Sequence, residues 1–104
     1  MATPTAISII EYKVIKDGTD AFLALIHADA FLNAMRSFAG FVSYSLVNLD
    51  EHTWCEYIYW DSTEAAYAGA KLSQTTAANM ALLTYLDSSS FKVKFLALET
   101  FIEN

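Results

Sequence analysis

Residues 53–72 read TWCEYIYWDSTEAAYAGAKL and contain an abrupt change in local structure. The first part, from Thr53 to Trp60, is rich in aromatic residues that favour a β-strand, and nothing in it breaks a strand. Residues 61–64 (DSTE) then supply a helix start, with a capping side chain and a carboxylate three residues on, and the alanine-rich run after them continues as helix. This stretch therefore predicts a strand that passes directly into a helix.

Both faces of the predicted strand are apolar or aromatic. Alternation along a strand separates two sets of side chains, namely Trp54, Ile58 and Trp60 on one face and Cys55, Tyr57 and Tyr59 on the other. The chain's own helices can cover one face, and a second copy of the chain is the simplest cover for the other. Because both faces are apolar, the pattern does not decide which one meets the helices.

The composition favours one domain spanning residues 1–104 that buries more apolar surface than a small monomer provides. Hydrophobic residues make up 55% of the chain and charged residues only 17%. Oligomerisation explains this balance, and an apolar pocket is the second explanation. The net charge of −6 argues against nucleic acid as a partner, since no basic patch is available to neutralise phosphates.

Several functional classes lack their sequence signals. No apolar run approaches the roughly 20 residues that a membrane helix needs, so no membrane partner is expected. Cys55 is the single cysteine, which favours a small buried residue and a reducing cytoplasm. The two histidines, His27 and His52, lack a metal-ligand spacing, and three scattered glycines form no phosphate loop. We therefore expect neither a metal nor another cofactor.

The order of predicted elements is βαββαβ. Strands are predicted at 6–15, 41–49, 53–60 and 91–102, with helices at 20–38, 62–72 and 75–86, a hairpin loop at 50–52 and a loop at 87–90. Right-handed connections place all the helices on one side of the sheet. This predicts an α+β, ferredoxin-like fold with an antiparallel sheet in the order 4-1-3-2. Two such sheets packed face to face would form a dimeric α+β barrel.

Two stretches carry a resemblance to a known family. Residues 40–45 (GFVSYS) and 57–66 (YIYWDSTEAA) resemble the antibiotic biosynthesis monooxygenase family of the dimeric α+β barrel superfamily, and the element order matches over nearly the whole chain. The resemblance implies a homodimer. Proteins of this kind include cofactor-independent oxygenases of polyketide-like phenols, quinol monooxygenases, haem-degrading enzymes, and many members with no known activity.

The chain departs from the functional residues of that family. Trp60 takes the place of the tryptophan that contacts substrate in the phenol-oxidising members. Glu56 stands where those members have an asparagine, and Ala66 where they have a tyrosine, although Tyr67 is adjacent. The haem-degrading members require an asparagine, a tryptophan and a histidine at places that here hold Glu11, Gly69 and Asn79. Haem degradation is therefore not expected.

His27 is one candidate catalytic residue. On a continuous helix over 20–38, His27 falls on the apolar arc near Phe31, so its imidazole is predicted to point into the interior. There it could act as a base or donate a hydrogen bond to a phenolic substrate. The alternative is a core histidine bonded to a backbone carbonyl or a tyrosine.

Glu56 is the other candidate catalytic residue. A carboxylate on a covered strand is unfavourable unless it is paired or protonated, so its pKa would be raised and it could serve as a base. A structural ion pair at the sheet or dimer seam is the alternative. The aromatic residues predicted to contact substrate are Trp60, Tyr67, Phe31 and Tyr57.

These residues support three hypotheses. The first is a homodimeric, cofactor-independent monooxygenase that binds a small phenolic or quinol-type aromatic between helices and sheet and deprotonates it for reaction with oxygen. The second is a non-catalytic ligand-binding or stress-response dimer of the same fold. The third is a structural dimerisation module with a filled core. An open cavity distinguishes the first two hypotheses from the third.

Overall fold

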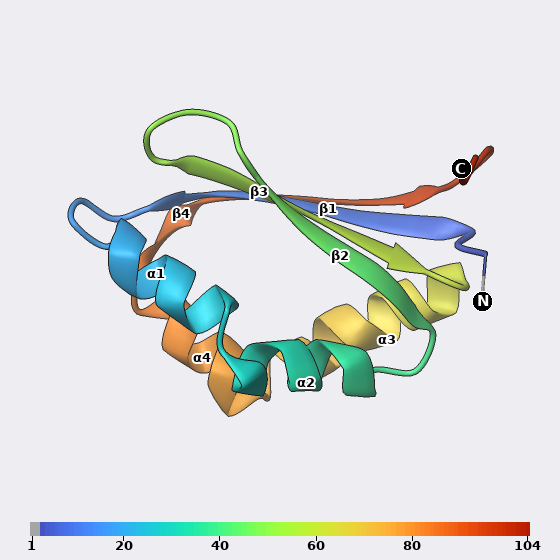
Figure 1. Cartoon of the computed structure of the whole chain (residues 1–104), viewed down its shortest axis with the longest axis horizontal. Coiled ribbons are helices and arrows are strands. Elements are labelled where there is room, and N and C mark those ends of the chain that lie inside the picture. The colour runs from blue at the N-terminus through green and yellow to red at the C-terminus, as the bar shows by residue number, and fades with distance from the viewer. Residues whose placement is uncertain (1–2) are drawn as a thin grey trace.

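The computed structural model describes residues 3–104, which form a four-stranded antiparallel sheet with four helices on one of its faces (Figure 1). The strands are β1 (Ala6–Val14), β2 (Phe41–Asn48), β3 (Thr53–Trp60) and β4 (Leu86–Ala97). The helices are α1 (Thr19–Ile26), α2 (Asp29–Ser37), α3 (Thr63–Ser73) and α4 (Ala77–Leu83). The sheet order β2-β3-β1-β4 is the predicted order read from the opposite edge, so the ferredoxin-like α+β fold is confirmed.

The step from β3 into α3 has the predicted local chemistry. The Ser62 hydroxyl accepts a hydrogen bond from the backbone N–H of Ala65 at 3.0 Å, which caps the helix. Gly40 precedes β2 with a φ of 81°, the left-handed conformation expected of a glycine at this turn. Its carbonyl accepts a hydrogen bond from the backbone N–H of Asp61 at 2.8 Å, which joins the start of β2 to the end of β3.

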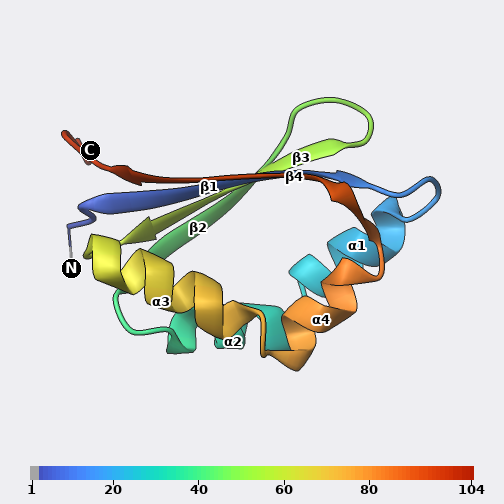
Figure 2. The ribbon, with the colours of Figure 1, turned by 180° about the vertical axis from the view of Figure 1, so that it is seen from behind.

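The helix predicted at 20–38 is instead two helices. His27 ends α1 with helical dihedral angles, and Ala28 then adopts an extended conformation with a ψ of 145°, which turns the chain before α2. Figure 1 shows the break between α1 and α2, and the view from behind shows α3 and α4 on the same side of the sheet (Figure 2). Since the helix is interrupted, a single helical wheel does not describe residues on both sides of Ala28. No helix within residues 3–104 is both long and apolar enough to cross a membrane.

The last strand also differs from its predicted bounds. β4 begins at Leu86 and ends at Ala97, so it includes the predicted loop 87–90 and stops before the predicted end at 102. Its pairing with β1 shifts register between Glu11, opposite Lys92, and Lys13, opposite Asp87. In this irregularity the Ser90 hydroxyl accepts a hydrogen bond from the Lys13 backbone N–H at 2.8 Å. Extra residues on one strand of a pair disrupt the ladder locally in this way, and here Ser90 supplies the acceptor for the Lys13 N–H.

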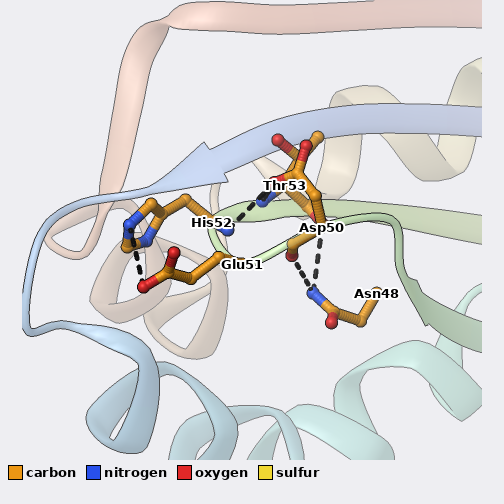
Figure 3. A network of polar contacts seen from close by, with 5 residues as sticks. All are labelled: Asn48, Asp50, Glu51, His52 and Thr53. Carbon is orange, nitrogen blue, oxygen red and sulfur yellow. Dashed lines mark hydrogen bonds and ion pairs between the residues drawn. The ribbon is translucent and has the colours of Figure 1, made fainter.

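The β2–β3 hairpin fixes the register of these two strands. The Asp50 carboxylate accepts hydrogen bonds from the backbone N–H groups of His52 and Thr53, each at 3.0 Å, and these bonds lower the pKa of Asp50 (Figure 3). Asn48 donates to the Asp50 carbonyl at 2.6 Å. His52 remains in this loop beside Glu51, with 3.7 Å between Nε2 and the carboxylate. The resulting register places Leu46 directly opposite Glu56.

The face of the sheet that carries Trp54 and Trp60 is the one that meets the helices, which the sequence had left open. Ser8 and Tyr12 of β1 and Trp60 of β3 are among the fully buried side chains on that side. Because side chains alternate along a strand, Cys55, Tyr57 and Tyr59 point toward the other face. Cys55 is buried, as predicted.

Candidate functional site

A cavity of about 590 Å³ lies between the helix-facing side of the sheet and helices α3 and α4. Its volume falls within the range usual for small-molecule sites. The walls are predominantly apolar and include side chains such as Ile10, Phe38, Leu82 and Phe91. The polar residues on the walls are Ser8, Tyr12, Glu56, Ser73, Gln74 and Asn79. The third hypothesis, a module with a filled core, does not fit this cavity.

Glu56 of β3 places a buried carboxyl group on the cavity wall. The residue is only 8% exposed, and one carboxyl oxygen, Oε2, accepts a hydrogen bond from the Tyr44 hydroxyl at 2.6 Å. Burial raises the pKa of Glu56, and the hydroxyl groups of Tyr44 and the nearby Tyr12 offset part of this rise. Once ionised, Glu56 therefore binds a proton more readily than an ordinary carboxylate does.

Tyr12 of β1 contributes a buried hydroxyl group to the same wall. Its side chain is 2% exposed, and its hydroxyl has no partner at hydrogen-bond distance among residues 3–104, although it lies near enough to the Glu56 carboxyl group for each to shift the pKa of the other. Burial and then the negative charge of Glu56 raise the pKa of Tyr12, so this hydroxyl keeps its proton. The ring is fixed by Phe22 and Phe91, whose ring centroids lie at 5.7 and 5.5 Å.

Trp60 forms another part of the wall and is held on several sides. It is 1% exposed, and its indole N–H donates a hydrogen bond to the Ser8 hydroxyl at 2.9 Å. Phe38 stacks on the ring at a centroid distance of 6.5 Å. A Cβ at Gly69 would overlap the ring, since it would lie 2.7 Å from Cζ3, so the glycine lets α3 approach the indole closely. The N–H is thus already paired, and Trp60 offers a ligand an aromatic surface.

The predicted inward orientation of His27 is wrong. The residue is exposed at the end of α1 and does not line the cavity. The helical wheel that placed it inside assumed one continuous helix, whereas the chain turns at Ala28. Without a place on the cavity wall, His27 cannot act as the base of a ligand bound there.

The other predicted aromatic contacts lie away from the cavity wall. Phe31 is buried and packs edge-on against Tyr44 at 5.5 Å, so it supports the partner of Glu56. Tyr67 is 55% exposed and stacks on Phe95 at 4.4 Å. Tyr57 points to the opposite face of the sheet. Of the six predicted site residues, the structure brings Glu56 and Trp60 to the cavity.

Tyr12 and Tyr44 are the site residues that sequence reasoning did not single out. In the sequence they are two of several aromatic residues on the predicted strands, which form core, interface or pocket lining without a pattern that separates these roles. Their positions depend on which residues of β1 and β2 lie near Glu56, and this is set by strand register. No cluster of three metal-binding side chains occurs among residues 3–104.

Comparison with known proteins supports the fold. No family model and no curated protein matches the chain. Rv0793 from Mycobacterium tuberculosis matches with a TM-score of 0.71 and 20% identity over 97% of this chain and 100% of that one. SnoaB, a cofactor-independent oxygenase from Streptomyces nogalater, matches with a TM-score of 0.71 and 9% identity over 96% and 99% of the two chains.

A third solved structure carries the name of the family suggested by the sequence. A proposed antibiotic biosynthesis monooxygenase from Nitrosomonas europaea matches with a TM-score of 0.73 and 13% identity, over 95% of this chain and 94% of that one. The predicted resemblance to structures of this kind is confirmed. At such low identities the likeness establishes the shared fold.

Proposed function

We propose that this protein is a cofactor-independent monooxygenase that binds a small phenolic or quinol-type aromatic in the cavity and uses Glu56 as the base. The observation that carries this proposal is a buried carboxyl group with a raised pKa on the wall of an otherwise mostly apolar cavity of about 590 Å³. The fold shared with SnoaB supports the reaction class. Such a cavity suits a flat aromatic molecule with few polar groups.

The proposed reaction begins with proton transfer from the phenolic hydroxyl to the Glu56 carboxylate. This step leaves a neutral Glu56 and an electron-rich phenolate, which is oxidised by dioxygen. One oxygen atom is incorporated at a ring carbon, the substrate loses its phenolic hydrogen and one ring hydrogen, and the second oxygen atom leaves as water. The product is a quinone. Apolar side chains such as Phe91 limit water around the reacting groups.

In this proposal the active form is a homodimer in the cytoplasm. The sheet face opposite the helices carries Tyr57 and Tyr59 and, from β4, Leu96, which is 47% exposed. Packing against the same face of a second copy would cover these side chains. Sedimentation equilibrium at micromolar concentration should give twice the mass of one chain. A monomer mass would contradict the dimer.

Oxygen uptake with a panel of anthrone-like phenols and quinols tests the proposed activity. Replacing Glu56 by glutamine should reduce turnover by about 100-fold or more, because loss of a general base typically has an effect of this size. Glu64→Gln is the matched control, since Glu64 is an exposed carboxylate on α3. The wild-type rate should fall with decreasing pH through the raised pKa of Glu56, above the ordinary value of 4.5.

The non-catalytic alternative uses the same cavity and needs no proton acceptor. Binding of the panel compounds with no oxygen uptake would favour that alternative and contradict the monooxygenase. Uptake that is unchanged in Glu56→Gln would retain the activity and remove Glu56 from the role of base.

A further inference from the structure

Two buried polar side-chain atoms lack a hydrogen-bond partner within residues 3–104, the Tyr12 hydroxyl and the Trp54 indole nitrogen. Only Tyr12 lines the cavity. A buried hydroxyl without a partner is unfavourable, and proteins retain few such groups. Since Tyr12 lines the cavity, a molecule bound there is the candidate for the missing partner of its buried hydroxyl.

The surroundings of Tyr12 define what this molecule must offer. Glu56 on the neighbouring strand β3 already accepts a hydrogen bond from Tyr44 at 2.6 Å, so one of its carboxyl oxygens is engaged. A carboxylate oxygen can accept more than one hydrogen bond, and Glu56 is close enough to affect the titration of Tyr12. The same part of the wall therefore combines an acceptor, Glu56, with a donor, Tyr12.

We infer that the Tyr12 hydroxyl is a substrate-binding group, which donates a hydrogen bond to the ring oxygen of the bound aromatic while Glu56 accepts the proton of that oxygen. This inference rests on the proposed function and adds a specificity requirement to it. The ligand must carry an oxygen that both donates and accepts, which is the chemistry of a phenol or quinol hydroxyl. An aromatic hydrocarbon of the same size satisfies neither group.

The same arrangement suits the product of proton transfer. When Glu56 has taken the proton, the ligand oxygen is negative, and a hydrogen bond from a neutral hydroxyl to a charged oxygen is stronger than one to a neutral oxygen. Tyr12 is ready to supply this bond because its ring is already fixed between Phe22 and Phe91. A donor placed in advance stabilises developing charge without rearrangement of the site.

Equilibrium binding of 2-naphthol and naphthalene, measured without oxygen, tests the inference apart from turnover. Wild-type protein should bind 2-naphthol more tightly than naphthalene. Tyr12→Phe should weaken 2-naphthol binding about tenfold, the effect of one hydrogen bond to a ligand, and leave naphthalene binding unchanged. Tyr67→Phe, at an exposed position away from the cavity wall, is the matched control and should leave both affinities unchanged.

Thermal unfolding of the unliganded variants distinguishes a ligand-binding role of Tyr12 from a structural role, because the loss of a structural hydrogen bond would lower Tm. Because the Tyr12 hydroxyl has no partner at hydrogen-bond distance among residues 3–104, Tyr12→Phe should not lower Tm. A lower Tm with an equal loss of affinity for both ligands would overturn the inference and make Tyr12 a structural partner of Glu56. Equal wild-type affinity for the two ligands would also overturn it.

The outcomes separate this inference from the proposed function. Tyr12-dependent binding of 2-naphthol without oxygen uptake on the phenol panel would support the anchoring role and contradict the monooxygenase. Oxygen uptake and 2-naphthol affinity that are both unchanged in Tyr12→Phe would support the monooxygenase and contradict the anchoring role of Tyr12.

Discussion

Two positions on the same face of β3, Glu56 and Trp60, have opposite polar environments. The Trp60 indole donates its only N–H to Ser8 and packs against Gly69 and Phe38, so its polar capacity is used and its ring is enclosed. The Glu56 carboxyl group is also buried but lies near the Tyr12 hydroxyl, which has no partner at hydrogen-bond distance among residues 3–104. The Trp60 region is therefore complete within the chain, whereas the Glu56 region has unused hydrogen-bonding capacity that a ligand can satisfy.

The two regions should respond differently to substitution. In the Trp60 region the side chains are closely packed, so a larger side chain would overlap its neighbours. In the Glu56 region, removal of charge relieves an unfavourable burial. One region should thus lose stability on substitution, and the other should gain it.

The largest expected effect is on Gly69 of α3. Gly69→Ala should lower the free energy of unfolding by about 1–3 kcal/mol, because the new methyl group overlaps the Trp60 ring and forces it to shift. Urea denaturation followed by circular dichroism measures the change. Alanine is normally favoured over glycine inside a helix by about 1 kcal/mol, so the sign of the effect is diagnostic.

The adjacent exposed position provides the control for Gly69. Ala68→Gly should cost about 1 kcal/mol through helix propensity alone. If Gly69→Ala instead stabilised the protein, the indole would have room to move, and the contrast between the two regions of β3 would fail.

The smaller effect is a gain in stability at Glu56. The pKa of Glu56 is raised in the folded protein, so the unfolded chain releases this proton at lower pH. The contribution of Glu56 to stability is therefore most favourable below the ordinary value of 4.5, declines as pH rises toward the folded pKa, and stays low above it. Glutamine does not ionise, so the Glu56→Gln variant lacks this loss of stability with rising pH. It should be more stable than wild type at neutral pH.

Urea denaturation at a series of pH values from 4 to about 8 measures this difference, with Glu64→Gln as an exposed control. Asp50 and Asp87, whose pKa values are lowered by hydrogen bonds, affect stability mainly below their ordinary value of 3.8 and so outside this window. A Glu56→Gln variant less stable than wild type at neutral pH would mean that the hydrogen bond from Tyr44 outweighs the unfavourable burial of the carboxylate.

Prediction from sequence succeeded where local chemistry decides structure. The aromatic strand ending at Trp60 and the helix start within residues 61–64 each depend on a few neighbouring residues. Glu56 was identified because it is a carboxylate on a covered strand and stands where the phenol-oxidising members of the resembled family have an asparagine. Its burial and raised pKa follow from that position.

Prediction failed at two local irregularities, a turn within a predicted helix and a register shift in a strand. The turn at Ala28 divided the first helix and left His27 exposed, because an apolar arc has meaning only on a continuous helix. The register shift in β4 absorbed residues 87–90 into the strand, since Ser90 satisfies a backbone group that a regular ladder would have paired.

The sequence by itself determined the order of strands and helices, the sheet topology and the presence of a carboxylate on a buried strand, because periodicity, caps and connection rules act over short distances. Only the tertiary structure decided which sheet face meets the helices and that Tyr12 and Tyr44 lie beside Glu56. Residues 12, 44 and 56 belong to three different strands. Their proximity depends on the pairing of those strands, and no local pattern encodes it.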